Sequence, residues 1–227
     1  MLATPLDKIK IEEFKKQIIE WYEVHGDKHL PWRNTKDSWA VLIASLLLRK
    51  TTTAQVIEVY EEFLRKFPNP QAVLSAGEEE VKKSIRPLGI EHQRTKCIME
   101  LAKELVGQFN GQIPCSKEEL KKLPGVGDYT ASEVLLVAYN KPEPLLDRNM
   151  IRVLERVFGV KSAKKRPHTD RELWLFAKAL VPEGSEEARK FNFGVLDFAR
   201  KICTARDPQC AICPVKGICQ YFSRTAK

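Results

Sequence analysis

The chain has 227 residues, of which 43% are hydrophobic and 30% charged, a composition ordinary for a globular protein with a sizeable core. Its net charge of +8 favours an anionic partner, most often nucleic acid, although a solvated Lys/Glu surface would carry the same charge. The first 25 residues are dense in Lys and Glu, which argues against a signal peptide. The apolar run 39–48 is far shorter than the roughly 20 residues of a membrane span, so no membrane partner is expected.

Apolar residues at helical spacing predict helices along most of the chain. The first stripe, from Ile11 to Tyr22, ends before Gly26, and 29–37 is expected to be a polar loop around the PWR motif. Residues 39–48 are apolar on all faces and should form a buried central helix. Ser116 with Glu119 is expected to open another helix as a capping box. Further helices are predicted at 53–66, 78–85, 92–109, 128–139, 149–158, 170–181 and 188–202. No segment alternates long enough to be a strand, so the predicted fold class is all-α.

Four cysteines lie in the last 25 residues with the spacing C-x6-C-x2-C-x5-C, at Cys203, Cys210, Cys213 and Cys219. Thiolates held this close favour zinc or an iron–sulfur cluster. Zinc knuckles usually contain two CxxC pairs, whereas this segment has one, so the spacing favours a [4Fe-4S] cluster over zinc and over a disulfide pair. Such thiolates belong in a reducing compartment, and a cytoplasmic, nucleoid-associated protein is expected.

A glycine turn, LPGVG at 123–127, lies between two predicted helices. Glycines two residues apart allow a tight turn to expose backbone N–H groups, and the next helix adds its positive N-terminal end. Gly125, Val126 and Gly127 are therefore candidates for contacts with a phosphate. A Gly-x-Gly turn alone is weak evidence, because many helix connections use glycine.

With its surroundings the turn becomes informative. The stretches LPGVGDYTA at 123–131 and LLDRNMIRVLERVFG at 145–159, together with the cysteine segment, resemble the helix–hairpin–helix (HhH-GPD) DNA glycosylases of the endonuclease III/MutY superfamily. PWR at 31–33, LLLRKTT at 46–52 and FNFGVLDFARKIC at 191–203 are most similar to the Mig-type branch, the T·G mismatch thymine-DNA glycosylases. Asp128 departs from the family, which often has a basic or neutral residue there; it should weaken phosphate binding slightly, or it could cap the helix.

The resemblance implies a two-lobed fold. Residues 31–142 would form a six-helix lobe containing the hairpin, and residues 1–30 would pack with 143–227 as the iron–sulfur lobe. Asp147 and Tyr129 would face the cleft between the lobes. The implied partner is double-stranded DNA with a mismatched or damaged base, bound by a monomer.

Asp147 is the candidate catalytic carboxylate. Cleavage of a glycosidic bond builds positive charge on the sugar, and a neighbouring carboxylate stabilises that charge and orients water. On local sequence alone, an Asp before a helix is more often an N-cap. In the family pattern this position is catalytic. Asn149 could position water or the sugar, or could be only a first-turn residue.

Tyr129 and Ser45 bear on mechanism and substrate. The endonuclease III branch has a lysine at the position of Tyr129, whose amine forms a Schiff base and leads to strand cleavage; a phenol cannot form an imine. Its alternative role is packing under the hairpin. Where relatives usually place a glutamate, which in MutY protonates adenine, Ser45 offers a hydroxyl that cannot deliver that proton well. It could instead donate a hydrogen bond to a pyrimidine carbonyl, or simply face the core.

Three further residues are candidates for reading the lesion. Lys50 falls where the superfamily places the residue that fills the hole left by the flipped base, and Arg49 could contact the opposite guanine. Ile90 matches an apolar wedge beside the orphaned base. The alternatives are solvated helix-end charges for Arg49 and Lys50, and ordinary core packing for Ile90.

The function expected from these residues is a monofunctional DNA glycosylase in base excision repair that removes thymine or uracil mispaired with guanine. The alternatives are a MutY-like adenine glycosylase acting on A·G or A·8-oxoguanine, an endonuclease III-like enzyme for oxidised pyrimidines, and a non-catalytic DNA-binding protein with a structural metal site made of the four cysteines.

Overall fold

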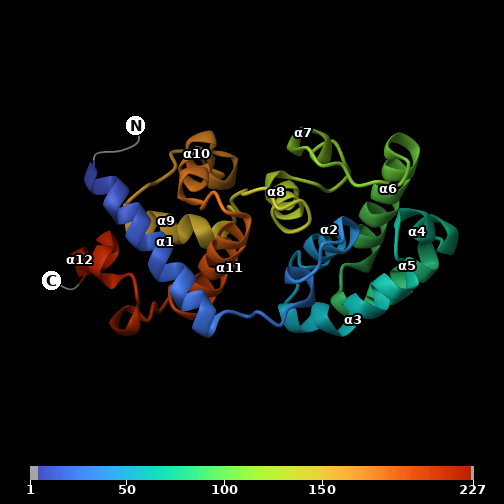
Figure 1. Cartoon of the computed structure of the whole chain (residues 1–227). Coiled ribbons are helices and arrows are strands. Elements are labelled where there is room, and N and C mark those ends of the chain that lie inside the picture. Colours follow the sequence, from blue (N-terminus) through green and yellow to red (C-terminus); the bar gives the residue numbers. More distant parts are fainter. Residues whose placement is uncertain (1–4, 226–227) are drawn as a thin grey trace. The chain divides into compact units, whose positions relative to one another are not determined.

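Helices account for the regular structure of residues 5–225, the part of the chain that the computed structural model describes. No strand occurs in this part, and none of its helices is long and apolar enough to span a membrane. The chain divides into two compact units (Figure 1): one spans Lys28–Lys141, and the other combines the chain up to Asp27 with the chain from Pro142 onward. Residues 1–4 and 226–227 of the expected iron–sulfur lobe lie outside the described residues.

The unit 28–141 is built around α2 (Ser38–Leu47). The Asp37 side chain accepts a hydrogen bond from Trp39 N at 2.9 Å and starts the helix, and every residue from Trp39 to Leu47 is buried. It packs against α8 (Asp128–Val137) and α3 (Thr53–Lys66). The remaining helices of the unit are α4 (Pro70–Ala76), α5 (Glu78–Ile85), α6 (Glu91–Phe109) and the four-residue α7 (Lys117–Leu120).

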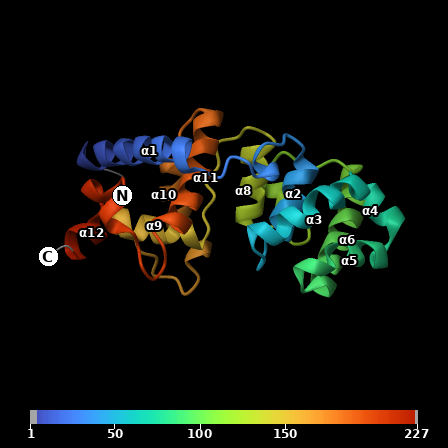
Figure 2. The same cartoon turned by 90° about the horizontal axis from the view of Figure 1, so that it is seen from below.

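The other unit pairs the two ends of the chain. Helix α1 (Pro5–His25) packs against α11 (Ser185–Lys201), and the two helices are neighbours in Figures 1 and 2. Gly194 allows this approach, because a Cβ there would come within 2.9 Å of the Ile18 side chain. Helix α9 (Arg148–Phe158) packs against α11 and α12 (Gln220–Thr225), and α10 is Arg171–Leu180.

A buried amide fixes the segment that enters α9. Asn192, on α11, is fully buried; its Oδ1 accepts from Leu145 N at 2.8 Å, and its Nδ2 donates to Glu143 O at 3.1 Å. These two bonds hold the extended chain immediately before Asp147, because its backbone groups have no helix of their own to bond with.

Three sequence expectations differ from the structure. Residues 31–33 form a 3-10 turn, in which Trp32 and Arg33 are buried, instead of a polar loop. Two short helices, α4 and α12, were not expected. Asn69 caps α4 by accepting from Ala72 N at 2.9 Å, with Pro70 in the first turn, so this Asn-Pro pair starts a helix.

Candidate nucleic-acid interface and catalytic site

The glycine turn connects α7 to α8 and forms a helix–hairpin–helix. Gly125 has a φ of +75°, which disfavours any residue with a Cβ, and a Cβ there would also come within 2.3 Å of the Cys97 sulfur. Gly125 and Gly127 are not buried, whereas Val126 is buried and its amide donates to Leu123 O at 3.0 Å. Val126 therefore stabilises the turn, while the two glycines are its exposed residues.

Asp128 does not cap α8. The N-cap is Gly127, and the Asp128 carboxylate forms an ion pair of 2.7 Å with Lys121 on the other side of the turn. Both side chains are exposed. The ion pair partly neutralises a lysine beside the exposed backbone amides.

Arg49 joins the hairpin to the end of α2. Its guanidinium donates to Gly125 O and, at 3.2 Å, to Thr130 Oγ1. Ser45 is buried and its hydroxyl donates to the same Thr130 oxygen at 3.0 Å. Ser45, Arg49 and the turn are thus brought together, and in this structure Arg49 contacts the hairpin carbonyl.

Lys50 and Ile90 share an unusual backbone conformation. Lys50 has a φ of +53° and Ile90 a φ of +45°, both in the left-handed region that non-glycine residues rarely adopt. Ile90 is 46% exposed although it is apolar, so it is not part of the core. Both residues border a cavity of about 200 Å³, whose other lining residues are Leu46, Arg49, Gln93, Arg94 and Cys97.

Asp147 is the N-cap of α9 and its carboxylate is held from two sides. Oδ1 accepts from Met150 N at 2.7 Å, and Oδ2 accepts from Asn149 Nδ2 at 2.7 Å. Burial raises the pKa of Asp147 above its ordinary value, and the hydrogen bonds from Met150 and Asn149 only partly offset that effect. The helix start provides a positive end beside the carboxylate. Asp147 is therefore an oriented, half-buried acid, and its cap role and its candidate catalytic role use the same geometry.

A second arginine connects this aspartate to the cysteine segment. Arg152 Nη2 donates to Asn149 Oδ1 at 3.1 Å and to Ala199 O at 2.8 Å, and Arg152 Nε donates to Cys203 O at 2.9 Å. The side chain of Asn149 is thereby fixed with its amide toward Asp147.

Tyr129, on α8, belongs to the unit 28–141 and is half-buried.

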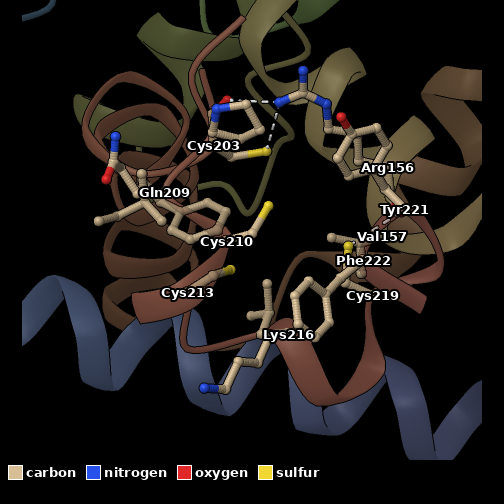
Figure 3. A pocket seen from close by; sticks show the side chains of 14 residues that line it. Arg156, Val157, Cys203, Gln209, Cys210, Cys213, Lys216, Cys219, Tyr221 and Phe222 are labelled. Atoms are coloured by element: carbon tan, nitrogen blue, oxygen red, sulfur yellow. Dashed lines mark hydrogen bonds between the residues drawn. The ribbon is translucent and has the colours of Figure 1, made fainter. Parts of the chain in front are cut away.

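The four cysteines border one cavity (Figure 3), together with Arg156, Phe198 and Tyr221. All four are free thiols, and Cys203 and Cys219 are buried. In the described part of the chain, no group of three or more His, Cys, Asp or Glu side chains is arranged to hold a single metal ion. Four cysteine sulfurs around one cavity suit a metal–sulfur cluster, which occupies more space than a single metal ion.

Arg156 ties the cysteine segment to α9. Its Nη1 donates to Cys203 Sγ at 3.4 Å and to Thr204 O at 2.6 Å, and its Nη2 donates to Ala205 O at 3.0 Å. Its guanidinium also lies 5.0 Å from the centre of the Tyr221 ring. These contacts hold Cys203 and the backbone after it against α9.

Sequence reasoning missed Thr130, Arg152, Arg156 and Asn192. Arg152 and Arg156 follow Asn149 at helical spacing, so the sequence could have predicted that the three side chains share one face of a helix. Asn192 had no such signal, because its partners are 47 and 49 residues away in the sequence.

Comparisons with known proteins agree with this geometry. Residues 43–179 match the model of the HhH-GPD superfamily base excision DNA repair proteins, and residues 203–219 match the iron–sulfur binding domain of endonuclease III. The chain is 63% identical to the thymine-DNA glycosylase of Aeropyrum pernix, over 96% of this chain and 98% of that protein. It is 60% identical to the thymine/uracil-DNA glycosylase of Pyrobaculum aerophilum, over 93% of each. Among solved structures, that of a thermostable thymine-DNA glycosylase matches with a TM-score of 0.89 at 32% identity, over 96% of this chain and 98% of that one.

The chain therefore belongs to the HhH-GPD superfamily of base excision DNA repair proteins, and its cysteine segment is an iron–sulfur binding domain. The resemblance predicted from the sequence and the all-α helix–hairpin–helix fold are both confirmed.

Proposed function

We propose that the protein is a monofunctional DNA glycosylase of base excision repair that removes thymine or uracil mispaired with guanine. The observation that carries the proposal is the oriented carboxylate of Asp147 at the start of α9, held by Met150 N and Asn149 Nδ2. The names of two relatives, at 63% and 60% identity, support thymine and uracil as the excised bases.

The chemistry follows from the bond that is broken. A base within a duplex cannot be reached, so its nucleotide must be flipped out, which costs least at a mismatch. As the glycosidic bond breaks, positive charge develops on the deoxyribose, and Asp147 stabilises it and orients the attacking water. Asn149 holds the carboxylate in place, because Arg152 fixes the direction of its amide.

Tyr129 and Ser45 define the type of glycosylase. Without a lysine amine at position 129 no Schiff base forms there, so the product is an intact strand with an abasic site. Thymine and uracil leave as stabilised anions, whereas adenine needs protonation. The Ser45 hydroxyl donates to Thr130, and serine is too weak an acid to protonate adenine.

The hairpin and the neighbouring loops would bind the DNA. Gly125 and Gly127 would expose amides to a phosphate, with Val126 supporting the turn, while Lys50 and Ile90 would probe the space around the flipped nucleotide. Arg49 would keep the hairpin aligned with Lys50, because it donates to Gly125 O. The proposed species on DNA is a monomer, and the proposed location is cytoplasmic, on the nucleoid.

Cys203, Cys210, Cys213 and Cys219 would hold a [4Fe-4S] cluster, which would stabilise a segment too short to fold alone. The donor set fits, because all four sulfurs border one cavity and Arg156 donates to Cys203 Sγ. Iron and sulfide analysis of the purified protein tests this: four of each per chain supports the cluster, and one zinc per chain contradicts it.

Release of the free base tests the function. Duplexes that differ only in one pair, T·G, U·G or T·A, are incubated with the protein and the released bases are quantified by chromatography. Free thymine and uracil from the mispairs, and none from T·A, support the proposal. Binding without release would indicate a non-catalytic DNA-binding protein.

A further inference from the structure

The loop between α2 and α3 is held by one buried side chain from another helix. Arg94, on α6, is only 5% exposed. Its Nη1 donates to Leu46 O at 2.7 Å and to Leu47 O at 2.8 Å, and its Nη2 donates to Arg49 O at 3.2 Å and to Thr51 Oγ1 at 2.8 Å. Four acceptors in the segment 46–51 therefore converge on one guanidinium.

This arrangement suits arginine and no other residue. The last carbonyls of a helix have no intrahelical partner and carry the negative end of its dipole. A planar guanidinium presents several N–H groups in a fixed fork, so one charge can bind carbonyls on both sides of the helix end. A lysine keeps the charge but is a single point, and it cannot satisfy the same set of acceptors.

The Arg94 side chain also holds the backbone on either side of the left-handed residue Lys50. Lys50 lies between two of its contacts, at Arg49 O and Thr51 Oγ1. Ile90 precedes α6, and its carbonyl accepts from Arg94 N at 3.1 Å, a main-chain bond that does not depend on the arginine side chain. Left-handed backbone at non-glycine residues costs free energy and persists where surrounding contacts impose it, most often at functional sites. Arg94 supplies such contacts at Lys50 and lines the cavity that Lys50 and Ile90 border.

We propose that Arg94 is the positioning residue that holds Lys50 in the geometry with which it enters the DNA beside the flipped nucleotide. This inference rests on the proposed function, which assigns Lys50 and Ile90 to DNA. Arg94 itself is buried and acts through Lys50.

The test compares Arg94→Lys with the wild type in two assays on the same T·G duplex. Single-turnover excision reports the whole reaction, and the fluorescence of a 2-aminopurine next to the thymine reports unstacking during flipping. Because small misplacements near a reacting group cost large factors in rate, both excision and the fluorescence rise should slow by about tenfold to a hundredfold. Arg65→Lys is the matched control: it is the same exchange at an exposed arginine of α3, and it should change neither rate.

Thr51→Val provides a second variant that leaves Arg94 intact. It removes one acceptor of the guanidinium together with the bond that Thr51 Oγ1 donates to Arg49 O at 3.0 Å. It should slow flipping about tenfold, the rate equivalent of two modest hydrogen bonds. If Arg94→Lys fails to fold, the rates of excision and of the fluorescence rise in Thr51→Val test the proposal in its place.

The outcomes separate the inference from the proposed function. Slower excision with an unchanged fluorescence rise, or no slowing of either, overturns the role of Arg94. If the wild-type protein flips the nucleotide but releases no thymine, the proposed function is contradicted. The rate of the fluorescence rise in Arg94→Lys, compared with the wild type, still tests the role of Arg94 in that case. A wild type that produces no fluorescence rise overturns the inference directly.

Discussion

Replacing Asp147 by asparagine removes a negative charge from the start of α9 and preserves the helix cap. The Asp147 Oδ1 bond to Met150 N can be made equally well by an asparagine oxygen, and asparagine is among the best N-cap residues. The substitution therefore removes the charge and keeps the cap, but it also gives up the bond that Oδ2 accepts from Asn149 Nδ2, because the asparagine NH2 group cannot accept.

The expected loss of activity follows from electrostatics. A carboxylate about 4 Å from the developing charge on the sugar stabilises it by about 4 kcal/mol at an effective dielectric constant of about 20. Since each 1.36 kcal/mol is a factor of about ten in rate, Asp147→Asn should slow excision about a thousandfold. Affinity for T·G duplex should stay within a few-fold of the wild-type value, because Asp147 contributes no positive charge to DNA binding.

The same substitution has a predicted effect on stability. Burial raises the native pKa of Asp147, so the folded state binds this proton more tightly than the unfolded chain does. The stability associated with that proton is lost as the pH rises from the unfolded pKa through the native pKa. Asp147→Asn avoids this loss but gives up the bond from Asn149 Nδ2, so at neutral pH its melting temperature should stay within a few degrees of the wild-type value. Wild-type excision should also fall as the pH drops through the native pKa of Asp147.

Asp170→Asn is the matched control. Asp170 also caps a helix, accepting from Glu172 N at 3.1 Å, and a hydrogen bond from Ser162 lowers its pKa. Its contribution to stability is present at neutral pH and is lost as the pH falls, the reverse of Asp147. This variant should be slightly less stable near neutral pH and fully active. If Asp147→Asn excised thymine within tenfold of the wild-type rate, the carboxylate would not be the group that stabilises the transition state.

Three further predictions concern the hairpin and its helix. Tyr129→Lys should gain strand cleavage that borohydride traps as a covalent complex, because a lysine amine can form the Schiff base; an untrapped variant would place position 129 away from the sugar. Asp128→Asn releases Lys121 from its ion pair and should tighten binding to undamaged DNA, steepening the salt dependence of log K by about one unit; an unchanged slope would mean that Lys121 contacts no phosphate. Gly125→Ala should weaken DNA binding because of its positive φ and the nearby Cys97 sulfur, whereas Gly107→Ala, at an open helical position of α6, should not.

Local sequence patterns predicted most of the helices, because apolar spacing and caps are local signals. Residues 53–66 and 78–85 form helices with the predicted bounds, and α2 differs by one residue at each end. The exceptions are short elements: the Asn-Pro start of α4 was overlooked after the helix stop at Phe67. The turn 31–33 was misjudged because its polar neighbours concealed the burial of Trp32.

The candidate residues were chosen from motifs, but the contacts that orient them come from distant parts of the chain. Arg94 reaches carbonyls and a hydroxyl 43 to 48 residues away, and Arg152 reaches Cys203 O across 51 residues. Arg49 could contact the opposite guanine or be a helix-end charge, and in the protein without DNA its guanidinium lies on Gly125 O. A sequence pattern identifies which groups are present, whereas such polar contacts depend on how helices far apart in the chain pack together.

Single-turnover excision from one duplex carrying T·G, U·G, A·G or A·8-oxoguanine, with and without alkali after the reaction, tests the proposed function most directly. Strand breaks at T·G and U·G that appear only after alkali are the predicted result. Breaks without alkali would mean that another amine performs the lyase step despite Tyr129. Breaks at the adenine strand would contradict the assignment of Ser45, because some other group would then have to protonate the base.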